Sequence, residues 1–101
     1  MIDSVYISGP ITSMPNLNKH NFSVAEAVLQ YRGYQTCNPF VVNRSLPDDS
    51  LHSDFMRVDI AELVKCQRIY MLHGWWHSRG AIVELIVAKA CGLKIMWEEI
   101  S

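Results

Sequence analysis

Residues 78–84 read Ser78-Arg79-Gly80-Ala81-Ile82-Val83-Glu84 and join two segments of different periodicity. The apolar run at 69–72, a few residues earlier, has the length and composition of a buried strand. Residues 82–90, which follow, have the spacing of a helix. Glu84 is therefore expected near the start of a helix, just past the C-terminal end of a strand, where open α/β sheets bind their ligands.

Glu84 is the leading candidate for a catalytic group. Burying a carboxylate in an otherwise apolar helix costs free energy, so a buried acid at this position suggests a chemical role. The alternative is that Glu84 is exposed and only stabilises its helix start, as acidic side chains in a first turn do. This stretch by itself fits both interpretations.

The composition indicates one globular domain, residues 1–101. The chain has 101 residues, enough for a single core, with 50% hydrophobic and 19% charged residues. The net charge is −1 and basic runs are no longer than a residue or two, so no nucleic acid is expected as a partner. A small phosphorylated ligand stays compatible, because backbone amides at a helix start bind anions without net basic charge.

Cysteine and histidine usage indicates neither a disulfide framework nor a metal site. Cys37, Cys66 and Cys91 are widely spaced, which is typical of reduced thiols in a cytoplasmic protein. His73 and His77 are four residues apart but span a predicted loop, and we expect no metal and no organic cofactor. The sequence shows no bilayer-spanning apolar stretch and no signal pattern, so no membrane partner is expected.

The order of predicted elements favours an α/β fold. Strands are predicted at 4–8, 34–38, 68–72 and 93–97, and helices at 21–31, 81–91 and from Ser53 or Asp54 to about residue 65. Residues 11–19 are predicted as a loop, and residues 40–52 as an irregular lid or exposed connection. The alternation predicts a small flavodoxin-like (Rossmann-like) three-layer sandwich with a four- to five-stranded parallel sheet.

Three loops are expected to meet at the C-terminal edge of this sheet: Ser8-Gly9-Pro10, Asn38-Pro39 and residues 74–80. The first strand carries neither a G-x-G-x-x-G fingerprint nor a P-loop, and Gly9 either admits a ligand or only shapes a turn. Trp75 and Trp76 would stack on a nucleobase if they border the site, and otherwise pack in the core or against a second subunit.

Asp59 is a second candidate acid. It lies mid-helix in Met56-Arg57-Val58-Asp59-Ile60, where aspartate is a poor helix former. It is either solvated or paired with Arg57, or it reaches the same cleft as Glu84. Two carboxylates in different environments suit glycosidic chemistry, one as nucleophile and one handling the proton.

Four motifs together resemble the nucleoside 2-deoxyribosyltransferase superfamily. They are Tyr-x-Ser-Gly-Pro at 6–10, Asn-Pro at 38–39, Met-Arg-x-Asp-Ile-x-x-Leu at 56–63 and Gly-Trp-x-x-Ser-x-Gly-Ala-x-x-Glu at 74–84. The resemblance spans nearly the whole chain and is greatest to the short, uncharacterised members that phages and prophages often encode. It implies a flavodoxin-like fold, a homodimer or larger homo-oligomer, and cleavage of an N-glycosidic bond.

The motif positions imply residue roles. Glu84 matches the nucleophile of the superfamily, Tyr6 the strand tyrosine that orients it, and Asp59 the helix aspartate that assists proton transfer to the base. Ser78, six residues before Glu84, matches the serine that holds the phosphate in nucleoside 5′-monophosphate N-hydrolases, where the transferases tend to have aspartate. A serine hydroxyl near a helix start also suits an anion physically.

Two features depart from the superfamily. Ile86 stands in Glu84-Leu85-Ile86-Val87-Ala88 where glycine is frequent, which bears on the shape of the pocket. The loop at 11–20 has no close match in characterised hydrolases, so the resemblance implies no preference for a particular base.

The sequence thus predicts a hydrolase that cleaves the N-glycosidic bond of a (deoxy)ribonucleoside 5′-monophosphate through Glu84, Asp59 and Tyr6. Contacts with the substrate are expected from Ser8, Gly9, Pro10, Asn38, Trp75, Trp76, Ser78 and Gly80. The alternatives are a nucleoside deoxyribosyltransferase and a non-catalytic nucleotide-binding module.

Overall fold

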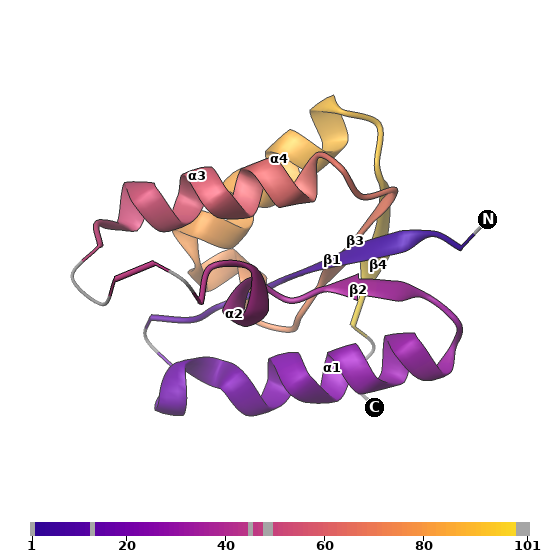
Figure 1. Cartoon of the computed structure of the whole chain (residues 1–101), viewed down its shortest axis with the longest axis horizontal. Coiled ribbons are helices and arrows are strands. Elements are labelled where there is room, and N and C mark those ends of the chain that lie inside the picture. The colour runs from indigo at the N-terminus through magenta and orange to yellow at the C-terminus, as the bar shows by residue number, and fades with distance from the viewer. Residues whose placement is uncertain (1, 13, 45, 48–49, 99–101) are drawn as a thin grey trace.

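Four parallel strands form one sheet in the computed structural model, which describes residues 2–12, 14–44, 46–47 and 50–98 (Figure 1). The strands are β1 (Ser4–Ser8), β2 (Gln35–Cys37), β3 (Arg68–Met71) and β4 (Lys94–Trp97), in the spatial order β2-β1-β3-β4. This order matches a flavodoxin-like sheet, whose switch point lies between β1 and β3. Ligands of such sheets bind beyond the carboxyl ends of these two strands.

Helices cover both faces of the sheet, which confirms the predicted three-layer α/β sandwich (Figure 1). The helices are α1 (Lys19–Tyr31), α2 (Pro39–Val42), α3 (His52–Leu63) and α4 (Arg79–Ala90), with 3-10 turns η1 (Pro15–Asn18) and η2 (Trp75–His77). α1 lies along one face, and α3 and α4 lie together on the other. Of the helices described, none is long and apolar enough to cross a lipid bilayer.

Alternation along β1 divides its side chains between two cores. Val5 and Ile7 pack on the α1 side, against a cluster that includes Phe22 and Leu29. Tyr6 points the other way, into the core that α3 and α4 close. β1 is therefore buried on both faces, as expected for a central strand of a parallel sheet.

Two predicted loops contain helical structure. Before residue 19, η1 leads directly into α1, which begins at Lys19 and not at residue 21. The stretch predicted as irregular overlaps α2, where Asn38 accepts a hydrogen bond from the backbone N–H of Phe40 and Pro39 occupies the first helical turn. A helix of one turn is too short to show a hydrophobic period, so the sequence pattern does not reveal it.

Two helix starts also differ from prediction. α3 begins at His52, because the Asp54 carboxylate accepts the backbone N–H of Leu51 from the third helical position. α4 begins at Arg79, two residues earlier than predicted, with Ser78 as its N-cap. The earlier start of α4 matters for function, because it places Ser78 at the N-terminus of the helix that carries Glu84.

Candidate active site

Glu84 lies on the face of α4 that packs against the sheet. Only 5% of the residue is exposed, so the interpretation of Glu84 as a solvated first-turn acid is wrong. Its neighbours on the same helix face, Ala81, Leu85 and Ala88, are buried apolar residues. A carboxylate in such surroundings requires hydrogen-bond donors.

Two hydroxyl groups of β1 are these donors. Tyr6 donates to Oε2 of Glu84 at 2.6 Å, and Ser8 donates to Oε1 at 2.7 Å. The two residues are two positions apart, so the pleat of the strand directs both side chains toward α4. Each oxygen of the Glu84 carboxylate therefore has its own donor, which fixes the orientation of the group.

The surroundings of Glu84 act on its pKa in opposite directions. Desolvation is the largest effect and raises the pKa, the hydroxyls of Tyr6 and Ser8 lower it, and the charge of Asp59 raises it again, to a final value of about 7. At neutral pH the group is therefore divided between its ionised and protonated forms. Burial, followed by the charge of Glu84, raises the pKa of Tyr6 well above its usual value, so this hydroxyl remains a neutral donor.

Asp59 is a second buried acid on the same side of the sheet. It is 6% exposed, and its Oδ1 accepts a hydrogen bond from Nδ2 of Asn43 at 2.9 Å. A solvated side chain is thus excluded, and within the described residues no ion pair joins it to Arg57. Burial raises the pKa of Asp59 to about 6, and the hydrogen bond from Asn43 opposes that rise.

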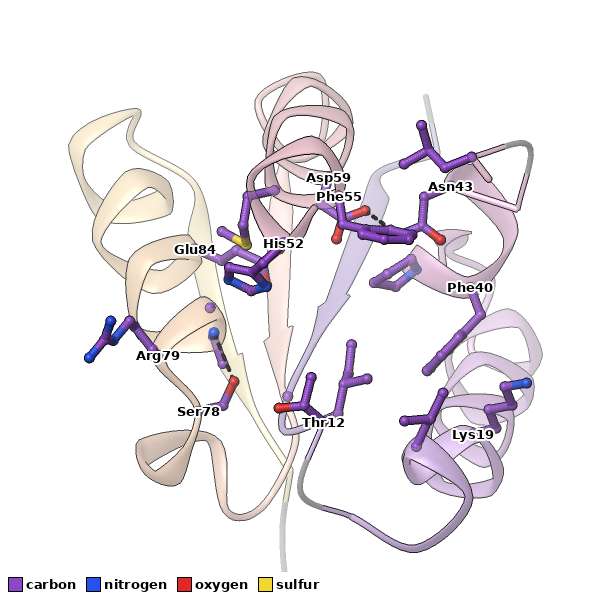
Figure 2. Close-up of a pocket in the computed structure, with 18 of the residues that line it drawn as sticks. Thr12, Lys19, Phe40, Asn43, His52, Phe55, Asp59, Ser78, Arg79 and Glu84 are labelled. Atoms are coloured by element: carbon purple, nitrogen blue, oxygen red, sulfur yellow. Dashed lines mark hydrogen bonds between the residues drawn. The ribbon is translucent and has the colours of Figure 1, made fainter. Parts of the chain in front are cut away.

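Both carboxyl groups border one cavity of about 840 Å³ beyond the carboxyl ends of β1 and β3 (Figure 2). Its walls come from the loop after β1, from α2 and α3, and from the start of α4. The volume lies within the range of small-molecule sites. A nucleotide-sized ligand therefore has space at the place that the topology predicts for a ligand.

Ser78 lies on the α4 wall of this cavity. Its Oγ accepts a hydrogen bond from the backbone N–H of Ala81 at 3.2 Å, so the hydroxyl proton remains available to a bound anion. The N-terminus of a helix of this length also carries partial positive charge. The geometry is compatible with the phosphate contact that the sequence predicts.

The two glycines of the predicted site line the cavity, and both also allow close packing. A Cβ on Gly9 would lie 2.7 Å from Cβ of Leu72, which leaves no room for a side chain. A Cβ on Gly80 would lie 3.3 Å from Sδ of Met56, so Gly80 lets α4 approach α3. These contacts give Gly9 and Gly80 a structural role besides any contact with a ligand.

Three other expected substrate contacts have different partners and do not line the cavity. Ser8 is fully buried and directs its hydroxyl to Glu84. Asn38 caps α2, and the carbonyl of Pro10 accepts a hydrogen bond from Asn18. The polar groups of these residues already have hydrogen-bond partners within the protein, so their role is to support the residues that line the cavity.

Trp75 and Trp76 also lie outside the cavity lining. The turn η2 directs the Trp75 ring to Trp97, at a centroid distance of 5.7 Å, and the Trp76 ring to His73, at 5.0 Å. The expected stacking on a base is therefore corrected for this cavity: Trp75 contacts Trp97 at the end of β4, and Trp76 contacts His73. The phenyl rings of Phe40 and Phe55 do line the cavity.

Phe40, Phe55 and Asn43 are not among the site residues predicted from the sequence. Figure 2 shows these three side chains together on one side of the cavity, with Ser78 and Arg79 on the other. For Phe40 and Asn43, the sequence signal is that they follow Asn38-Pro39 closely, a pair that is predicted to lie at the C-terminal edge of the sheet. Phe40 and Asn43 approach Asp59 because α2 packs against α3, whereas Phe55 lies on α3 together with Asp59.

Charged residues of both signs line the cavity, and Figure 2 shows the Arg79 side chain directed away from it. Lys19, Arg44 and Arg79 line it, against the two acids Asp59 and Glu84. Across the residues that the structure describes, no group of three His, Cys, Asp or Glu side chains is arranged to hold a metal ion.

The substitution of isoleucine for glycine at position 86 lies away from the site. Ile86 is 60% exposed and does not line the cavity. The expected effect of this departure on the pocket shape is therefore not seen for this cavity.

Comparison with known proteins identifies a family and a fold. The family described as "Domain of unknown function (DUF4406)" matches residues 3–97. Among solved structures, a 2-deoxyribosyltransferase of Bacillus psychrosaccharolyticus is similar, with a TM-score of 0.75 and 19% identity over 97% of this chain and 77% of that chain. No curated protein gives a significant match. The structural similarity shows a shared fold.

Proposed function

This chain belongs to the DUF4406 family, and for it we propose cleavage of the N-glycosidic bond of a (deoxy)ribonucleoside 5′-monophosphate, with Glu84 as the nucleophile. One observation carries the proposal. A buried carboxylate is held by two hydroxyl donors at the border of a large cavity, at the switch point of the sheet. Structural roles for a buried acid do not require an opening to a cavity of this size.

In the first step, the ionised carboxylate of Glu84 attacks the anomeric carbon C1′ of the sugar. A C1′–O bond forms, and the C1′–N bond breaks with its electron pair moving to the base. Asp59, in its protonated form, gives a proton to the departing base. The hydrogen bonds from Tyr6 and Ser8 hold Glu84 in place and favour its ionised form.

In the second step, water attacks C1′ of the glycosyl-enzyme and the C1′–O bond breaks. Asp59, now ionised, accepts the proton of that water, and both carboxyl groups return to their starting states. Two successive displacements at C1′ retain the configuration of the sugar.

The 5′-phosphate is assigned to the α4 wall. Ser78 offers its hydroxyl proton there, and backbone amides near Gly80 offer further donors at the helix start. The base is then directed to the opposite side of the cavity, where Phe40, Phe55 and Asn43 lie (Figure 2). This assignment puts Asp59, which contacts Asn43, on the side of the base.

A second candidate is transfer of the sugar to another base. The observation that favours it is the similarity in fold to a structure described as a 2-deoxyribosyltransferase. The first step is the same in both reactions. The outcomes differ only in whether water or a second base attacks the glycosyl-enzyme.

The test is release of base from a panel of nucleoside 5′-monophosphates and nucleosides by the wild type and Glu84→Gln, compared side by side. We expect base release by the wild type and none by Glu84→Gln, because the amide keeps the shape but is no nucleophile. Equal release by both proteins would remove Glu84 from its role. If added free base diverts the sugar to a new nucleoside, the reaction is transfer.

Binding of the same panel separates an enzyme from a non-catalytic module. A nucleotide that binds to both proteins without release of base from either would favour a nucleotide-binding module. Circular dichroism of the two proteins provides the control that Glu84→Gln is folded.

A further inference from the structure

The amide of Asn43 binds one oxygen of Asp59 and leaves the other free. Nδ2 of Asn43 donates to Oδ1, and no hydrogen bond from a described residue reaches Oδ2. Among all the residues that the structure describes, every fully buried side-chain oxygen has a hydrogen-bond partner. Oδ2 is therefore not sealed in the core, and because Asp59 lines the cavity, this oxygen is accessible from it.

The chemistry of an amide nitrogen decides where the proton of Asp59 resides. The NH₂ group of asparagine can only donate hydrogen bonds. The oxygen that it contacts must act as an acceptor, which the carbonyl oxygen of a neutral carboxylic acid does well and its hydroxyl oxygen does poorly. In protonated Asp59, the proton is then on Oδ2.

We propose that Asn43 is a positioning residue that holds Oδ1 of Asp59 as an acceptor and thereby places the transferable proton on Oδ2, facing the cavity. The proposal rests on the proposed function, in which this proton passes from Oδ2 to the nitrogen of the departing base as the C1′–N bond breaks. Asn43 acts through Asp59.

Charges on neighbouring elements are compatible with this arrangement. The negative charge of Asp59 raises the pKa values of Tyr6 on β1, Cys37 on β2 and Glu84 on α4. Of these, Glu84 titrates in the same pH range as Asp59, whereas Tyr6 and Cys37 stay neutral. The hydrogen bond from Asn43 favours the ionised form of Asp59, so its removal raises the pKa of that group.

The main experiment uses Asn43→Leu, which keeps the approximate volume and removes the donor. Gln30→Leu is the matched control, since it also removes an amide hydrogen bond, to Thr36, away from the cavity lining. The substrates are a purine nucleoside 5′-monophosphate and its N7-methylated counterpart. The methylated base is cationic in the nucleotide, so it leaves as a neutral molecule without gaining a proton.

We expect Asn43→Leu to lower kcat about tenfold on the ordinary nucleotide with KM nearly unchanged, as for one lost hydrogen bond to a charged group. On the methylated nucleotide the loss should disappear, and Gln30→Leu should match the wild type on both. An equal loss on both substrates would show that Asn43 only maintains the structure or binds substrate, and would overturn the proposal.

A second measurement does not depend on catalysis. Carbon-detected NMR titration of the Asp59 carboxyl group should give a higher pKa in Asn43→Leu than in the wild type. An unchanged pKa would overturn the proposal even if the protein is active. If the wild type releases no base from any nucleotide, the proposed function fails, and a raised pKa in Asn43→Leu would still show the hydrogen bond that fixes the proton.

Discussion

The hydroxyl of Tyr6 on β1 lies 2.6 Å from Oε2 of Glu84 on α4, and it donates a hydrogen bond to this oxygen across 78 positions of sequence. The contact joins the central strand to the helix that covers it. Because Tyr6 is fully buried, the hydrogen bond is shielded from water, and its loss should have a measurable effect on Glu84.

Tyr6→Phe should reduce base release by about two orders of magnitude, as removal of one preorganised donor does at other sites. It should also move the optimum of the pH–rate profile to higher pH, since this hydrogen bond lowers the pKa of Glu84. The measurement is kcat/KM as a function of pH. Tyr31→Phe, at an exposed position on α1, is the matched control, and an identical profile for both variants would contradict the orienting role.

Glu84→Gln should make the protein more stable at pH 8 than the wild type. The pKa of Glu84 is raised from 4.5 to about 7 in the folded state, so the stability linked to its protonation is complete below about pH 4.5 and is lost as the pH rises through 7. Ionisation of Glu84 at alkaline pH therefore lowers the free energy of unfolding of the wild type by about 3 kcal/mol. Urea unfolding at pH 4.5 and pH 8 measures it. A stability gap that does not grow with pH would be inconsistent with the raised pKa.

The pH–rate profile of the wild type should be bell-shaped with its maximum between pH 6 and 7. The reaction needs ionised Glu84, with a pKa of about 7, and protonated Asp59, with a pKa of about 6. The two groups interact, so the limbs report the pair and not single residues. Asp59→Asn should abolish the alkaline limb and leave weak activity that rises with pH. A retained alkaline limb in this variant would exclude Asp59 as the acid.

Ser78→Ala should weaken binding of a 5′-monophosphate by about 1–3 kcal/mol and leave binding of the nucleoside nearly unchanged. It should also lower the free energy of unfolding by about 1 kcal/mol, because Ser78 is the N-cap of α4. Ser78→Asp separates the two effects, since aspartate keeps the cap but repels phosphate. Calorimetric titration with both ligands checks this, and equal losses for nucleotide and nucleoside would contradict a phosphate contact.

Self-association is expected from apolar side chains that remain exposed. Trp76, Trp97 and Ile86 are each about half exposed or more, which is unusual for large apolar residues of a small domain. We expect a homodimer or larger assembly at micromolar concentration, measured by light scattering. Ile86→Lys should weaken it if the outer face of α4 is the contact. A monomeric wild type would refute the expectation.

Local sequence patterns predict the four strands, the three longer helices and the two acids that border the candidate site. Apolar runs of strand length and the 3.6-residue period of α1 are local signals, so they can be read without coordinates. Glu84 and Asp59 were identifiable because a carboxylate within an apolar helix contradicts its local surroundings. The short helix α2 is not predicted, because a single turn that begins at Asn38 and Pro39 is too short to show a hydrophobic period.

The side chains that surround these acids are set by tertiary packing. Ser8 faces Glu84 and not a ligand because the sheet register and the position of α4 close over it. Asn43 reaches Asp59 because α2 packs against α3, and the Trp75-Trp76 pair turns to Trp97 and His73 because η2 lies beside the end of β4. Such contacts depend on distances between elements that are far apart in the chain. Local periodicity carries no information on those distances, and packing alone sets them.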